Sequence, residues 1–99
     1  MSVRIQVNRE RVAQFCQRHR IRKLAVFGSV LRDDFRPDSD VDVLVEFEPG
    51  CRLGLFEVIR MQREFSAIIG READFRTPED LGRYMRRRVM SESEVLYAA

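Results

Sequence analysis

Apolar residues recur at helical spacing in two stretches of the chain, residues 8–19 and 55–69. Asn8 can cap the start of the first stretch, and Gly70 can end the second. In the first, one face carries Val12, Phe15 and Cys16. In the second, the predicted inner side carries Leu55, Val58, Ile59, Phe65 and Ile68 or Ile69, and Phe56 is also assigned to the core. Both stretches are therefore predicted to be amphipathic helices.

Three shorter segments have the pattern of strands: residues 21–27, 41–47 and 71–76. The second alternates, with Val41, Val43, Val45 and Phe47 on one face and Asp40, Asp42, Leu44 and Glu46 on the other. We also expect a short helix over residues 29–34 and a loop over residues 37–39.

The last third of the chain begins with a helix start signal. Thr77 is a candidate N-cap, Pro78 suits the first helical position, and Asp80 completes a pattern like a capping box. A break is expected near Gly82, followed by helix to Met90, while the pattern leaves the state of residues 91–99 open. The alternation of helices and strands predicts an α/β (α+β) fold, a small three- to four-stranded mixed sheet flanked by helices, in a single domain over residues 1–99.

Composition limits the class of protein and the compartment that can be expected. The 44% hydrophobic content is ordinary for a folded core, and no apolar run approaches the roughly 20 residues of a membrane span. The first residues lack the apolar stretch of a signal peptide, so a cytoplasmic location without a membrane partner is expected. The two cysteines, Cys16 and Cys51, have no metal-site spacing and are predicted to be reduced.

The total charge is nearly balanced, with 18 basic and 16 acidic residues, but its distribution is uneven. Basic residues gather at 18–23 and 83–88, and acidic residues gather at 33–42. A basic surface around an acidic metal site would suit a nucleotide or an acidic partner. Outside the motif described next, solvated helix faces explain the arginines equally well.

The chemistry lies in a Gly28-Ser29 turn after the first strand, a ten-residue spacer, and Asp40-Val41-Asp42. A glycine turn lets backbone N–H groups approach phosphate, and Ser29 adds a hydroxyl. Asp40 and Asp42 point to the same side of a strand and can hold Mg²⁺ with substrate phosphates. A third carboxylate, Asp74, joins them if strands 41–47 and 71–76 are neighbours. Two metal ions could then stabilise an in-line displacement.

The segment LAVFGSVLRDDFRPDSDVDVLVEF (24–47) resembles the minimal nucleotidyltransferases of the DNA polymerase β superfamily, whose signature is Gly-Ser, ten residues and Asp-x-Asp. GREADFRTPEDL (70–81) resembles the family's third-carboxylate strand and the following helix start, although Phe75-Arg76 stands where an aliphatic pair is commoner. The resemblance implies a polymerase-β-like fold, phosphate binding by Gly28 and Ser29, and catalytic metal ligation by Asp40, Asp42 and Asp74.

The resemblance also implies a reaction and a partner. Members of this size often act as antitoxins (MNT type) beside a helical HEPN-type toxin encoded nearby, and some transfer AMP from ATP to a tyrosine of that toxin. We therefore expect a Mg²⁺-dependent protein adenylyltransferase that uses ATP, forms a hetero-oligomer and does not bind nucleic acid directly. The alternatives are an antitoxin that masks its partner without chemistry, and transfer to a small molecule, which the short chain disfavours.

Overall fold

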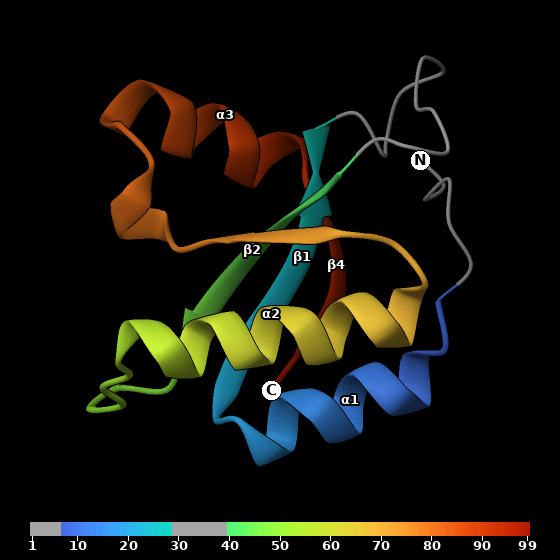
Figure 1. Cartoon of the computed structure of the whole chain (residues 1–99). Coiled ribbons are helices and arrows are strands. Elements are labelled where there is room, and N and C mark those ends of the chain that lie inside the picture. Colours follow the sequence, from blue (N-terminus) through green and yellow to red (C-terminus); the bar gives the residue numbers. More distant parts are fainter. Residues whose placement is uncertain (1–6, 29–39) are drawn as a thin grey trace.

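The computed structural model describes residues 7–28 and 40–99. It contains a four-stranded sheet in the order β3-β2-β1-β4, with helices on both sides (Figure 1). The elements are α1 (Arg9–Arg18), β1 (Ile21–Phe27), β2 (Val41–Phe47), α2 (Leu55–Ile69), β3 (Ala73–Arg76), the 3-10 helix η2 (Pro78–Asp80), α3 (Arg83–Glu92) and β4 (Glu94–Ala98). The predicted fold class is confirmed, whereas the predicted helix over 29–34 and loop over 37–39 lie outside the described residues.

The sheet is mixed. Strand β1 runs antiparallel to both β2 and β4, while β2 runs parallel to β3. The predicted neighbour relation between the second and third strands is therefore confirmed. The parallel pairing begins where the Val41 backbone N–H donates to the Glu72 carbonyl, at 2.8 Å.

Helix boundaries follow the predicted signals closely. The Asn8 side chain accepts from the Arg11 backbone N–H at 3.1 Å, and Gly70 ends α2 with a φ of 70°. Thr77 and Asp80 form the predicted capping box, although the helix they start is one 3-10 turn. A new helix, α3, then begins after Gly82, as the expected break there implied.

The main core lies between the sheet and the pair α1 and α2. Three phenylalanine rings hold these layers together: the Phe65 centroid lies 5.4 Å from that of Phe15 and 5.7 Å from that of Phe75. Edge and tilted contacts of this kind add stability beyond the buried area alone. The valines of β2 that were predicted to face inward, Val41, Val43 and Val45, are buried there.

Helix α3 lies on the side of β3 away from α1 and α2 (Figure 1). Its buried residue is Val89, and the β2 side chain Leu44 is also buried, with 1% exposed. Leu44 was predicted to lie on the face opposite Val41, Val43 and Val45, and it does. It is nevertheless buried, a packing that the alternation within one strand could not reveal.

One question that the sequence left open is answered, and one prediction is wrong. Residues 91–99, whose state was left open, contain β4, which pairs with β1 and adds the fourth strand. The predicted inner side of α2 is partly wrong: Met61, Phe65 and Ile69 are buried, but Leu55 is 72%, Phe56 77% and Ile59 36% exposed. The first turn of α2 extends past the edge of the core, so its apolar residues face outward.

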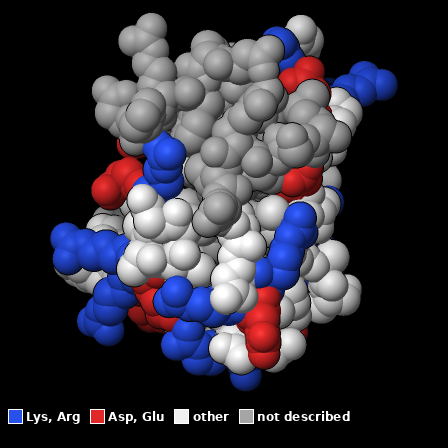
Figure 2. All heavy atoms as spheres, turned by 90° about the vertical axis from the view of Figure 1, so that its right-hand side faces the viewer, with Lys and Arg blue, Asp and Glu red and all other residues white. Residues whose placement is uncertain are grey.

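Within residues 7–28 and 40–99, no helix is both long and apolar enough to cross a membrane. Both cysteines are free thiols, as predicted, with Cys16 buried and Cys51 half-buried. Figure 2 views the side on which α1 begins and α2 ends, where basic and acidic side chains are interspersed. This mixture agrees with the nearly balanced total charge.

Candidate active site at the end of the sheet

Strand register brings three of the predicted site residues to one end of the sheet. Asp42 stands opposite Phe27 at the end of β1, so Gly28 follows directly beside it. On its other side Asp42 is paired with Asp74 of β3. Because β2 and β3 are parallel and in register, the two aspartates project from neighbouring positions on the same face of the sheet. Backbone pairing alone therefore assembles Gly28, Asp42 and Asp74.

Gly28 is held in a conformation and a space that only glycine fits. Its φ is +79°, in the left-handed region that L side chains rarely adopt. A Cβ at this position would lie 2.5 Å from Oδ2 of Asp42. The backbone at Gly28 can therefore lie against the Asp42 carboxylate because Gly28 carries no side chain. Ser29, the other half of the predicted phosphate turn, lies outside the described residues.

Asp40 and Asp42 flank Val41, whose side chain is fully buried. Asp40 is exposed just before β2 begins, and Asp42 is half-buried within it. Because Val41 is anchored in the core and its N–H donates to Glu72, the backbone of this acidic pair is fixed at the point where β2 meets β3. The pair is thus exposed to solvent on one side and rigidly supported on the other.

Asp74 is 37% exposed and pairs with Arg76, whose Nη2 donates to Oδ2 at 2.9 Å. Strand β3 is the edge of the sheet, so its outward N–H groups need other acceptors. Two side chains of α2 supply them: the Ala73 N–H donates to Ser66 Oγ at 2.9 Å, and the Phe75 N–H donates to Gln62 Oε1 at 2.8 Å. These bonds hold the backbone on either side of Asp74.

Gln62 and Ser66 are supporting residues that the sequence analysis missed. The signal was available, since two polar residues four positions apart lie next to the buried Met61 and Phe65 of an amphipathic helix. Polar groups at the inner edge of such a helix need partners, and an exposed strand edge is the usual source of unpaired N–H groups.

The donor set suits a hard divalent cation, because carboxylate oxygens are what Mg²⁺ prefers. Its geometry is not that of a closed metal cage: among residues 7–28 and 40–99, no three His, Cys, Asp or Glu side chains are gathered closely enough to hold an ion. Mg²⁺ at such sites takes several of its ligands from water and substrate phosphates. Asp40, Asp42 and Asp74 have the side-chain chemistry for a cation that brings other ligands with it, but to join such a site Asp74 would have to loosen its ion pair with Arg76.

A family model described as "Nucleotidyltransferase domain" matches residues 9–96 of the chain. The chain belongs to the nucleotidyltransferase domain family. The match includes every candidate site residue and extends from α1 into β4. The enzyme class expected from the Gly-Ser and Asp-x-Asp pattern is thereby confirmed, while the roles of the individual residues stay predictions.

Two curated relatives of this nucleotidyltransferase carry adenylyltransferase names. The Methanocaldococcus jannaschii protein MJ0435, provisionally named a protein adenylyltransferase, is 29% identical over 76 residues, which cover 77% of this chain and 80% of that protein. The protein adenylyltransferase MntA of Thermococcus cleftensis is 36% identical over 58 residues, which cover 59% of this chain and 57% of that protein.

Solved structures agree with the fold. A protein provisionally described as a minimal nucleotidyltransferase superposes with a TM-score of 0.71 at 35% identity, covering 87% of this chain and 86% of that one. A toxin–antitoxin structure with AMP-PNP gives a TM-score of 0.73 at 13% identity, covering 94% and 75%. A Shewanella oneidensis complex of a tri-AMPylated HEPN toxin with its MNT antitoxin gives 0.60 at 12% identity, covering 92% and 70%. The last two likenesses concern the fold alone.

Proposed function

We propose that this nucleotidyltransferase transfers AMP from ATP to a tyrosine hydroxyl of a HEPN-type toxin and so acts as its antitoxin. The observation that carries the proposal is the register of Asp42 with Asp74, with Gly28 closed against Asp42. The names of the curated relatives and of the solved complexes support the choice of a protein acceptor. The two free thiols agree with a reducing, cytoplasmic setting in which ATP is available.

In the proposed reaction the acceptor hydroxyl oxygen attacks the α-phosphorus of ATP. The new phosphorus–oxygen bond forms as the bond to the β-bridging oxygen breaks, and pyrophosphate leaves. Gly28 and Ser29 would hold the outgoing phosphates through backbone N–H groups. Asp74 would assist removal of the hydroxyl proton. For this task Asp74 would have to be released from its ion pair with Arg76.

Mg²⁺ would be held by Asp40, Asp42 and Asp74, and when bound it would neutralise charge on the phosphates. The contribution of the chain is positional: β1 ends in the turn at Gly28, and β2 and β3 present the carboxylates from a fixed backbone. Most of the rate enhancement of a phosphoryl-transfer site comes from such positioning and charge stabilisation.

One observation favours a second candidate function, an antitoxin that masks its partner without chemistry. In the described residues Asp74 is engaged by Arg76, and the carboxylates are not gathered into a complete ligand set. A complex that neutralises the toxin equally well after Asp40→Asn and Asp42→Asn substitution would support masking.

Intact-mass spectrometry separates the two. The purified HEPN-type partner is incubated with this chain, ATP and Mg²⁺, in parallel with the Asp40→Asn/Asp42→Asn double variant. AMP-sized additions with the wild type only are expected. No addition, with a stable complex still formed, would reject transfer and favour masking.

A further inference from the structure

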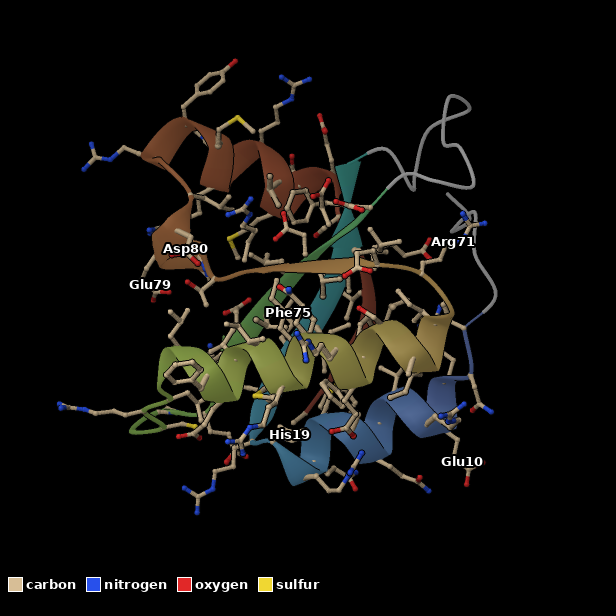
Figure 3. All side chains as sticks on the ribbon, viewed as in Figure 1. Glu10, His19, Arg71, Phe75, Glu79 and Asp80 are labelled. Carbon is tan, nitrogen blue, oxygen red and sulfur yellow. The ribbon has the colours of Figure 1, made fainter. Side chains whose placement is uncertain are left out.

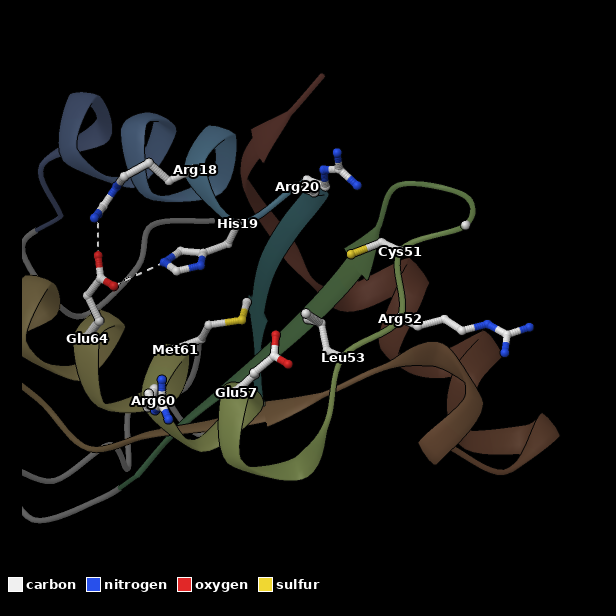
Figure 4. Close-up of a pocket in the computed structure, with 11 residues that line it drawn as sticks. Arg18, His19, Arg20, Cys51, Arg52, Leu53, Glu57, Arg60, Met61 and Glu64 are labelled. Atoms are coloured by element: carbon white, nitrogen blue, oxygen red, sulfur yellow. Dashed lines mark hydrogen bonds and ion pairs between the residues drawn. The ribbon is translucent and has the colours of Figure 1, made fainter.

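A second region with binding chemistry lies at the other end of the sheet. A pocket of about 660 Å³ is formed where α1 ends, where the chain passes from β2 to α2, and along the start of α2 (Figure 4). Asp42 lies five residues before Phe47, the last residue of β2, which is about 17 Å at ~3.3 Å per residue, and the pocket residues of this connection, from Gly50, come after Phe47. The pocket is too distant to share in phosphate chemistry at the carboxylates.

The pocket is rich in arginine. It is lined by Arg18, Arg20, Arg52 and Arg60, against the two carboxylates Glu57 and Glu64. Glu64 is already paired, because it accepts from Arg18 and lies 3.0 Å from His19 Nε2. Among the described residues, no carboxylate pairs with Arg20, Arg52 or Arg60. The lining therefore carries a net positive charge that the described chain leaves unbalanced.

Arg20 occupies its position at a conformational cost. Its φ is 58°, and it is the one non-glycine residue with positive φ among the described residues. It directly follows the C-cap residue His19 of α1, a place where glycine is strongly favoured. Strained backbone is often retained where the side chain has a function. Here it sets the Arg20 guanidinium at the edge of the pocket (Figure 4).

The pocket lining also has an apolar part. In Figure 4, Met61, Leu53 and Cys51 lie between the arginines, with the Glu57 carboxylate between Met61 and Leu53. Beside the pocket on α2, Phe56 is 77% exposed and lies one helical turn before Arg60. A pocket whose lining combines arginines with apolar side chains, next to an exposed aromatic residue, is typical of a protein-binding site.

We propose that this surface, made of the pocket and the exposed start of α2, is a docking site for an acidic segment of the protein substrate that carries an apolar anchor residue. Carboxylates of the segment would pair with Arg20, Arg52 and Arg60, whose planar guanidinium groups suit them. The anchor would sit over Met61 and Leu53. The proposal rests on the proposed function, because the docking site would bind the acceptor protein of that reaction away from the carboxylates.

A small free anion, such as a nucleotide, is the competing occupant. It would use the arginines but would leave Phe56 exposed, since Phe56 does not line the pocket. A protein segment accounts for both features with one contact surface. The protein is therefore the occupant that the charge and the apolar exposure favour together.

The test measures the dissociation constant between this chain and the purified HEPN-type partner by fluorescence anisotropy. Arg60→Gln should weaken binding at least about tenfold, with a smaller dependence on salt. Arg63→Gln is the matched control, since Arg63 is an exposed arginine of the same helix that does not line the pocket. It should leave the dissociation constant within about twofold of wild type.

Two further variants separate docking from folding. Arg20→Gly should weaken binding while the melting temperature stays the same or rises, because glycine relieves the positive φ. Phe56→Ser should weaken binding of the partner but leave binding of metal-free ATP unchanged. If metal-free ATP binds through Arg60 and does not compete with the partner, the proposal is rejected in favour of a free-anion site.

Cys51 gives a direct footprint, because it lines the pocket. Burial raises the pKa of the Cys16 thiol to about 12, so iodoacetamide should alkylate native protein at Cys51 alone. Bound partner should protect Cys51. Unchanged alkylation in the complex, unchanged affinity of Arg20→Gly and Arg60→Gln, or no binding of the partner by wild type would each overturn the proposal. Intact docking without AMP transfer would reject only the proposed function.

Discussion

The two ends of the sheet differ in how their charged residues are held. At one end Gly28, Asp42 and Asp74 are set by strand register and by a glycine that closes against a carboxylate. At the other end the arginines come from a helix terminus, a connection and a helix start, and one of them is held at positive φ. The first arrangement gives the fixed geometry that chemistry needs. The second gives an adaptable charged surface of the kind used for recognition.

The largest expected effect comes from breaking the core that joins the two regions. Phe65 is fully buried between Phe15 and Phe75, so Phe65→Ala should lower the free energy of unfolding by about 3–5 kcal/mol. Both AMP transfer and partner binding should then fail together. Urea unfolding followed by circular dichroism measures the loss.

Phe56→Ala is the control, with the same substitution in the same helix. Phe56 is 77% exposed, so the free energy of unfolding should change by less than about 0.5 kcal/mol. An equal loss in both variants would contradict the burial described for α2.

A more selective variant disturbs only the carboxylate end of the sheet, where Gly28, Asp42 and Asp74 lie. In Gly28→Ala the new Cβ would meet Asp42 Oδ2 at 2.5 Å, so the carboxylate must move. Since displacement of a reacting group by about 1 Å can cost about a hundredfold in rate, AMP transfer should fall by roughly that factor. Initial rates of labelled AMP incorporation measure it.

Gly70→Ala separates crowding from backbone strain. Gly70 also has positive φ, at +70°, but among the described residues no atom beyond its two chain neighbours lies within 4 Å of a Cβ built there. Both variants should lose about 1–2 kcal/mol of stability from backbone strain, but Gly70→Ala should keep its rate within about twofold. Equal loss of rate in both variants would show that strain, not contact with Asp42, explains the effect.

The smallest expected effect concerns the arginine end of the sheet, the pocket lined by Arg18, Arg20, Arg52 and Arg60. Burial raises the pKa of Glu64, but hydrogen bonds and charge from His19 and Arg18 outweigh it and hold that pKa below its usual 4.5. A lowered folded-state pKa means stabilisation that is present above about pH 4.5 and is lost as the pH falls through the folded value. Glu64→Gln should therefore cost up to about 1 kcal/mol at neutral pH, because the pair is partly exposed, and nothing in stronger acid.

Glu57→Gln serves as the control for that pH dependence. Glu57 lines the same pocket and, among the described residues, makes no ion pair. Its substitution should leave the pH profile of thermal unfolding unchanged. If the pH profiles of thermal unfolding are parallel for wild type and Glu64→Gln, the pairing of Glu64 with Arg18 and His19 does not stabilise the fold.

The carboxylate end could be predicted from the sequence because its signals are local. The spacing of Gly28, Asp40 and Asp42 and the alternation of β2 gave their faces, and one correct assumption about neighbouring strands added Asp74. The supports of Asp74, Gln62 and Ser66, depend on which strand forms the edge of the sheet. That is a tertiary property, and no local pattern contains it.

The arginine end could not be predicted for a related reason. Phe56 and Leu55 fit the apolar pattern of α2, yet the helix begins beyond the core, so pattern without packing assigned them wrongly. Strand β4 could not be recognised because Leu96 is its one buried residue, which gives no alternating pattern. Its strand conformation depends on pairing with β1. Residues brought together from distant segments have no spacing to recognise.

The measurement that tests the central claim most directly is a set of initial rates of AMP transfer over a range of partner concentrations. Asp42→Asn should lower kcat by roughly a hundredfold to a thousandfold with little change in KM. Arg60→Gln should raise KM about tenfold with kcat preserved, as expected for a contact made equally in ground and transition states. Wild-type kcat in Asp42→Asn, or a fall in kcat without a rise in KM for Arg60→Gln, would contradict the assignment of chemistry to one end and docking to the other.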